Sequence, residues 1–182
     1  MAAGSTYDQI FTTTLNAAAA SVTISSIPST YTDLVMVGFL RSDTVTYNNM
    51  NFPVLTFNGD NGSNYSVTNL YARNTGAGDT AASTRSSTQA SINFGGIVTT
   101  ASTTGIYSPY TINVMNYSNT TTYKSSLCRI SAQTNLTATD GLNASVGLWR
   151  STAAVSSMTL TCSSSGLFVI GSSFTLYGIT AA

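Results

Sequence analysis

The amino-acid sequence predicts an all-β protein, a single-domain antiparallel β-sandwich that is jelly-roll-like. Residues that favour strands (Thr, Val, Ile, Tyr and Phe) are abundant, whereas Glu is absent and Lys and Gln are scarce. Strand-like runs recur at short intervals between segments rich in Gly, Asn and Ser. Hydrophobic residues make up 42% of the 182 residues, which is enough for a substantial core. Many short strands of this kind fit a sandwich better than one open sheet.

The expected strands follow from the spacing of apolar residues between turn-forming segments. In chain order they are 7–12, 21–27, 33–40, 54–57, 65–71, 91–98, 110–117, 123–131, 144–149, 155–162, 167–170 and 174–179.

The first twenty residues contain Tyr7, Ile10 and Phe11 before a run of four alanines. This segment, 1–20, is expected to be either an edge strand of the sandwich or an arm that contacts a neighbouring subunit. The β-sandwich domain is expected to occupy residues 21–182. No stretch has the pattern of an export signal or of a membrane-spanning helix, so we expect no membrane partner.

The strands of the central segment carry the clearest local pattern. Tyr110, Ile112 and Val114 share one face of a strand because side chains alternate along a strand. The polar turn at 118–122 then predicts a hairpin with the strand 123–131.

Three other segments complete the prediction. Met158, Leu160 and Cys162 alternate with threonines and should form one buried face. The segment 58–64, rich in Gly and Asn, predicts a turn between two strands. The segment 74–89 has no apolar residue larger than Ala and is expected to be a long exposed loop, and long loops in compact domains are often contact loops.

The charged residues exclude several classes of function. The chain has six acidic residues, all Asp, six basic residues and no His, and its formal net charge is zero. Without histidine there is no Ser-His-Asp triad and no imidazole metal ligand. Six scattered cations cannot neutralise a phosphate backbone, so we expect no nucleic-acid partner. The sequence predicts no catalytic, cofactor-binding or metal-binding residues.

The sequence also predicts roles for individual reactive or charged side chains. Cys128 and Cys162 are expected to be two buried thiols, with a disulfide between neighbouring strands as the alternative. Lys124 is expected to be a solvated strand residue. Asp60 lies in a segment with some similarity to a calcium loop, but the alternating acids and the terminal Glu are missing, which favours a plain turn.

The ten tyrosines allow two interpretations. They could line a sugar-binding face, since a tyrosine ring stacks on apolar sugar faces and its hydroxyl forms hydrogen bonds. They could instead fill the strand ends of the sandwich, which is the interpretation we favour. Paired aspartates for glycoside hydrolysis remain a third hypothesis, although each Asp lies near a turn or strand end, where Asp is structurally favoured.

Four segments carry a resemblance to a known class of proteins. They are Asn-Gly-Asp-Asn-Gly-Ser-Asn-Tyr-Ser at 58–66, Asn-Tyr-Ser-Asn-Thr-Thr-Thr-Tyr-Lys at 116–124, Gly-Leu-Trp-Arg-Ser-Thr-Ala-Ala-Val at 147–155 and Phe-Val-Ile-Gly-Ser-Ser-Phe-Thr-Leu-Tyr-Gly-Ile at 168–179. They resemble segments of small structural proteins of tailed bacteriophages. The resemblance implies a non-enzymatic virion component that is made in the host cytoplasm. It brings no catalytic residues, and it implies structural roles in the core for Trp149, Phe174, Leu176 and Tyr177.

Two functional hypotheses follow from the resemblance and the weakly charged composition. The first is a capsid decoration (cement) protein, a homotrimer whose partners are the major capsid protein and copies of itself. The alternative is a tail-fibre or receptor-binding module that recognises host surface glycan through the tyrosines.

Overall fold

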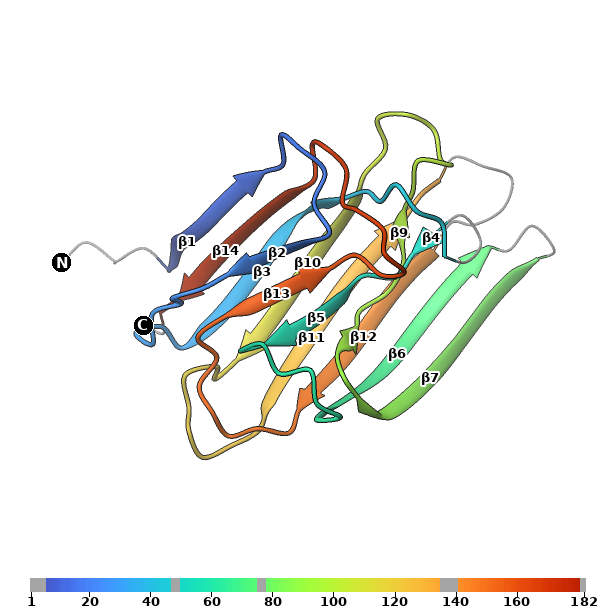
Figure 1. Cartoon of the computed structure of the whole chain (residues 1–182). Helices are drawn as coiled ribbons and strands as arrows, with labels where there is room; N and C mark the ends of the chain where they lie inside the picture. Colours follow the sequence, from blue (N-terminus) through green and yellow to red (C-terminus); the bar gives the residue numbers. More distant parts are fainter. Residues whose placement is uncertain (1–5, 47–49, 75–77, 135–140, 181–182) are drawn as a thin grey trace.

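The computed structural model describes residues 6–46, 50–74, 78–134 and 141–180 (Figure 1). Over these residues the backbone forms antiparallel strands and turns and contains no helix, so the predicted all-β class is confirmed. No helix in this part of the chain is long and apolar enough to cross a membrane.

The larger sheet is antiparallel and has eight strands. In spatial order they are β1 (Tyr7–Thr14), β14 (Ser173–Ile179), β3 (Asp33–Leu40), β10 (Ser108–Met115), β11 (Lys124–Ala132), β12 (Gly141–Trp149), β6 (Tyr65–Asn74) and β7 (Asp79–Gln89). β1 is one edge of this sheet and is hydrogen-bonded to β14, and β7 is the other edge.

The smaller sheet packs on the middle of the larger one. It consists of β2 (Ser21–Ile24), β13 (Met158–Thr161), β5 (Val54–Phe57) and β8 (Ile92–Asn93), and a separate pair is formed by β4 (Met50–Asn51) and β9 (Ile97–Val98). β6 and β7 extend beyond the smaller sheet, on the right of Figure 1. The predicted sandwich is therefore confirmed. The narrower jelly-roll arrangement is not, because the strands divide unequally, eight against four.

The core fills the space between the two sheets. Alternate residues of β10 and β11 are buried, as the predicted hairpin requires, and the two strands pair from Tyr110 with Ile130 to Met115 with Ser125. The Trp149 ring stacks on a fully buried tyrosine, with ring centroids 6.4 Å apart.

The residues with implied core roles divide between the two faces of the larger sheet. Trp149, Phe174 and Leu176 are buried, as expected. Tyr177 is not in the core. It alternates with Leu176 on β14 and therefore points to the opposite, outer face of the sheet.

Two predicted strands differ from the structure. The run 91–98 is split into β8 and β9, because Gly95 has a φ of 120° that bends the chain between them. The run 167–170 is not a strand, and its Phe168 forms only isolated bridges with Ala19 and Ser42.

The prediction of a loop over 74–89 is wrong for most of this segment, because residues 79–89 form the strand β7. β7 pairs with β6 from Val67 opposite Ser86 to Asn74 opposite Asp79. The hairpin is stabilised by backbone hydrogen bonds alongside an existing sheet, so it needs no apolar side chains of its own.

Candidate functional site: an apolar sheet face and a polar cleft

The two cysteines are free and buried, as predicted. Burial raises the pKa of the Cys128 thiol to about 12 and also raises the pKa of the Cys162 thiol. A thiol with a raised pKa is a poor nucleophile, because the thiolate is the reactive form. Both side chains therefore serve packing.

Lys124 is buried, so the expectation of a solvated side chain is wrong. Its Nζ donates hydrogen bonds to the backbone oxygens of Thr122, at 2.6 Å, and Thr152, at 3.2 Å. Burial lowers the pKa of its amine, since desolvation disfavours the charged form. Lys124 thus joins two loops at one end of the sandwich.

Asp60 is held within the turn 58–64 and reaches across to the larger sheet. Its carboxylate accepts hydrogen bonds from Trp149 Nε1 at 2.7 Å, from the Gly62 amide at 2.8 Å and from Asn64 Nδ2 at 2.9 Å. These bonds, with that from Trp149 the strongest, lower the pKa of Asp60. Over the described residues no cluster of three or more His, Cys, Asp or Glu could hold a metal ion.

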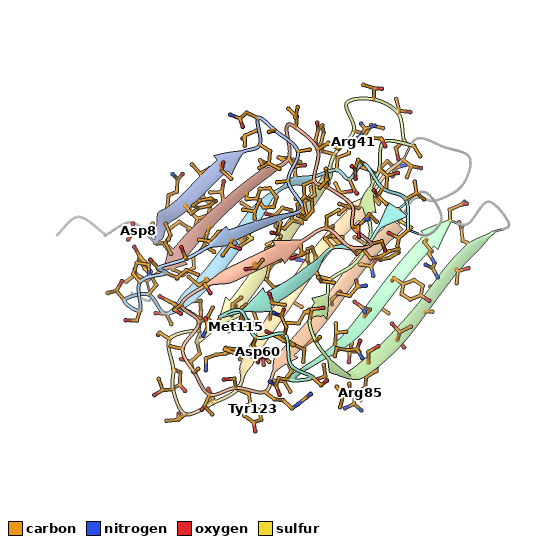
Figure 2. All side chains as sticks on the ribbon, in the orientation of Figure 1. Asp8, Arg41, Asp60, Arg85, Met115 and Tyr123 are labelled. Atoms are coloured by element: carbon orange, nitrogen blue, oxygen red, sulfur yellow. The ribbon has the colours of Figure 1, made fainter. Side chains whose placement is uncertain are left out.

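The remaining charged residues are dispersed. In Figure 2 the labelled Asp8, Arg41 and Arg85 lie toward separate margins of the molecule, away from Asp60. Several other aspartates accept hydrogen bonds from their own local donors: Asp33 from the Asn116 amide, Asp43 from the Leu167 amide and Asp79 from Asn74 Nδ2. Asp140 lies outside the described residues. The hydrolase hypothesis gains no support from these local roles.

The tyrosines do not form one face within the described part of the chain. Tyr65, Tyr110 and Tyr117 are buried in the core. Tyr7 and Tyr177 meet edge-to-face near the β1 edge, with ring centroids 6.0 Å apart. The Tyr65 hydroxyl accepts a hydrogen bond from the amide of Phe57, and Tyr117 donates to the oxygen of Pro28, so these rings connect strand ends to loops.

The outer face of the larger sheet is turned away from the viewer in Figure 1. Exposed apolar side chains gather on this face. Ten large hydrophobic residues are exposed in the described structure, and seven of them lie on this face. The seven are Tyr7, Phe39, Leu70, Met115, Leu127, Leu142 and Val146. Exposed apolar patches of this kind mark interaction surfaces.

The apolar patch is continuous across the strands β11, β12 and β6. Leu127 lies directly opposite Val146, and Leu70 lies opposite Ala144. Leu142, which is 59% exposed, borders three shallow hollows of about 250, 350 and 550 Å³. These hollows could receive side chains of a partner.

The inner face of β6, β7 and β12 forms a different kind of surface where the smaller sheet ends. Along β6 the inward positions change from Tyr65 and Val67 to Asn69, Tyr71 and Arg73. These polar side chains line a cleft of about 220 Å³ together with side chains of neighbouring strands and of β8. The described residues that line it are Met50, Phe52, Asn69, Tyr71, Arg73, Thr84, Asn93, Gly95, Gly141 and Asn143.

Two amides of this cleft are oriented by the protein. The Oδ1 atom of Asn69 accepts a hydrogen bond of 2.5 Å from the Ser145 hydroxyl, and Oδ1 of Asn93 accepts one of 3.0 Å from the Gly95 amide. The Arg73 guanidinium lies over the Tyr71 ring, 4.6 Å from its centroid. Sequence reasoning missed this site, although the change from apolar to polar at alternate positions of β6 is a readable signal.

Comparison with protein-family models, with curated proteins and with solved structures finds no match.

Proposed function

We propose that this chain is a non-enzymatic structural protein of a virion, a capsid decoration protein that binds neighbouring shell subunits. The observation that supports the proposal best is the gathering of seven exposed hydrophobic side chains on the outer face of the eight-stranded sheet. A protein that works by burying surface needs such a face and needs no catalytic groups.

The outer face is large enough for a stable contact. With strands about 4.8 Å apart and a rise of about 3.3 Å per residue, eight strands of about eight residues cover about 1,000 Å². A specific interface of standard size buries about 800 Å² on each partner. The sheet face can therefore supply a complete interface without help from loops.

The chemistry of the outer face also suits burial. Its strands carry few charges, with Arg129 on β11 and Arg85 on β7 against Asp33 and Asp79 near the ends of their strands. Few charges mean a low desolvation cost when the face is covered. The partner face on the shell should accordingly be flat, weakly charged and largely apolar.

Self-association uses the sheet edges in this proposal. β1 and β7 each pair on one side only, and exposed edges are templates for strand pairing or for cover by another copy. A homotrimer built through these edges leaves the outer face available to the shell. Sedimentation equilibrium of the purified chain should give three times the mass of one chain, and a strictly monomeric chain refutes the trimer.

The direct test is electron microscopy of intact particles of the phage that encodes this chain. Density of the chain is expected on the shell at capsid symmetry axes, with the outer face of the sheet against the capsid protein. Density confined to the tail would refute the proposal.

A matched pair of variants tests which face is used. Val146→Lys places a charge on the outer face, whereas Val45→Lys places the same charge on an exposed valine away from that face. We expect Val146→Lys to lose binding to capsids that lack the protein and Val45→Lys to retain it. If the two variants bind capsids equally well, the outer face is not the surface that contacts the capsid.

The receptor-binding alternative relied on a face lined by tyrosines. Because the described tyrosines are divided among the core, the β1 edge, the loops and the cleft, that face is not the basis of the function proposed for the chain.

A further inference from the structure

Half of the described residues that line the cleft on the inner face of β6, β7 and β12 are uncharged and polar, namely Asn69, Tyr71, Thr84, Asn93 and Asn143. Ligand sites are usually apolar with a few polar groups, so a polar lining selects a polar ligand. A volume of about 220 Å³ corresponds to roughly seven water molecules, which is room for one sugar ring. We propose that this cleft binds a neutral saccharide.

The hydrogen-bonding groups of the cleft are set up for hydroxyl partners. Because Oδ1 of Asn69 and Oδ1 of Asn93 are each engaged by the protein, their Nδ2 groups are left to donate to a ligand. The Asn143 side chain and the Tyr71 hydroxyl make no hydrogen bond to other described residues. An amide combines a donor and an acceptor and can serve two adjacent sugar hydroxyls at once.

Close packing places Asn143 at the cleft. A Cβ added to Gly95 would lie 2.6 Å from the Cβ of Asn143, so only glycine lets the bend between β8 and β9 approach β12 this closely. Gly95 also has the positive φ that presents its amide to Asn93. The same glycine therefore positions two of the amides.

The walls of the cleft offer apolar contact as well. Phe52, Met50 and Tyr71 are among the lining residues, and the Arg73 guanidinium lies over the Tyr71 ring. Aromatic rings suit the apolar C–H faces of sugars, while hydroxyls and amides bind their edges.

Other ligand classes fit less well. Among the described lining residues there is no carboxylate, which argues against a cation or an amine. A lipid would leave the amides of the cleft desolvated without partners. Of the lining residues that the structure describes, Arg73 alone is charged, and the uncharged polar groups outnumber it, which favours a neutral sugar over an acidic one.

The saccharide site is independent of the proposed capsid contact, because it lies on the opposite face of the sheet. A test should first find a ligand and then locate it. The full-length protein is screened on an array of bacterial surface oligosaccharides, both neutral and acidic. Neutral hits are then titrated while the side-chain amide signals are followed by nuclear magnetic resonance.

We expect a neutral oligosaccharide to bind with a Kd of about 1 mM or tighter and to shift the signals of Asn69, Asn93 and Asn143. Asn143→Ala should weaken binding about tenfold or more, since two hydrogen bonds are lost. Asn113→Ala is the matched control, because Asn113 lies in a strand on the outer face and should leave binding unchanged.

Three results would overturn the inference. They are the absence of any neutral hit, exclusive binding of acidic oligosaccharides, and a hit whose affinity is the same in the wild type and in Asn143→Ala. The variant Val146→Lys should retain saccharide binding even if it loses capsid binding, so failure of one proposal does not imply failure of the other.

Discussion

Replacing Asp60 by alanine should destabilise the fold by about 2–3 kcal/mol. The carboxylate accepts hydrogen bonds from Trp149 Nε1 at 2.7 Å, from the Gly62 amide and from Asn64. A hydrogen bond to a charged group contributes about 1.5–3 kcal/mol, and the turn is partly solvated, which reduces the sum. The larger part of the loss comes from the buried indole N–H of Trp149, which would be left without an acceptor.

The single tryptophan makes this prediction convenient to measure. Trp149 is 2% exposed, so its fluorescence reports unfolding in urea directly. A loss of 2 kcal/mol corresponds to a fall in Tm of roughly 4–8 °C for a domain of this size. Asp79→Ala is the control, because the one hydrogen bond described for that carboxylate is an exposed contact with Asn74. If Asp60→Ala and Asp79→Ala lose the same stability, the Trp149–Asp60 contact has no structural importance.

The pH dependence gives a second measurement on the same pair. The hydrogen bonds favour the ionised carboxyl and lower the pKa of Asp60 below 3.8. The stabilisation is therefore fully present above the unfolded pKa and is lost as the pH falls through the lower folded pKa. The difference in stability between wild type and Asp60→Ala should be constant near neutral pH and shrink below about pH 4. A difference that is the same at all pH values would contradict this reasoning.

Three further variants or measurements test the packing. Tyr110→Phe removes a buried hydroxyl without a hydrogen-bond partner and should raise the unfolding free energy by up to about 1 kcal/mol in urea, whereas a loss above that size would show a hidden partner. Gly38→Ala would place a Cβ 2.0 Å from the backbone oxygen of Ser173, so a loss of about 3 kcal/mol is expected, and unchanged stability would refute the close approach. Cys128 and Cys162 should react with a thiol reagent only after unfolding, and rapid reaction in the native state would contradict their burial.

Strands with apolar residues at alternate or successive positions were predictable from the sequence. The bounds expected for 33–40 and 54–57 agree with β3 and β5, because turn-forming residues flank both runs. β7 was not predictable in this way, since an edge strand paired on one side requires only backbone hydrogen bonds. The apolar run 167–170 was wrongly predicted to be a strand, for the opposite reason. Its Phe168 is buried in the core without lying in a strand.

The candidate surfaces depend on tertiary contacts that the sequence does not reveal. The Lys124 amine is buried where it donates hydrogen bonds to the backbone oxygens of Thr122 and Thr152. Thr152 lies 28 residues further along the chain, so this contact depends on the tertiary fold. On β12 the outer face carries the apolar Leu142 and Val146 and most of the inner face is small or polar, so the sequence alone could not show that these two apolar residues remain uncovered. Only the position of the smaller sheet determines which face becomes core.

The extension of β6, β7 and β12 beyond the smaller sheet connects the two candidate surfaces. A strand that buries almost nothing adds little to stability, and the eleven residues of β7 are nearly all exposed. The hairpin nevertheless widens the apolar outer face and supplies one wall of the polar cleft. Because side chains alternate along a strand, Leu70 and Tyr71 of β6 serve opposite faces. A partner that covers the outer face therefore leaves the cleft open to solvent, so the proposed capsid contact and the proposed saccharide site are compatible with each other.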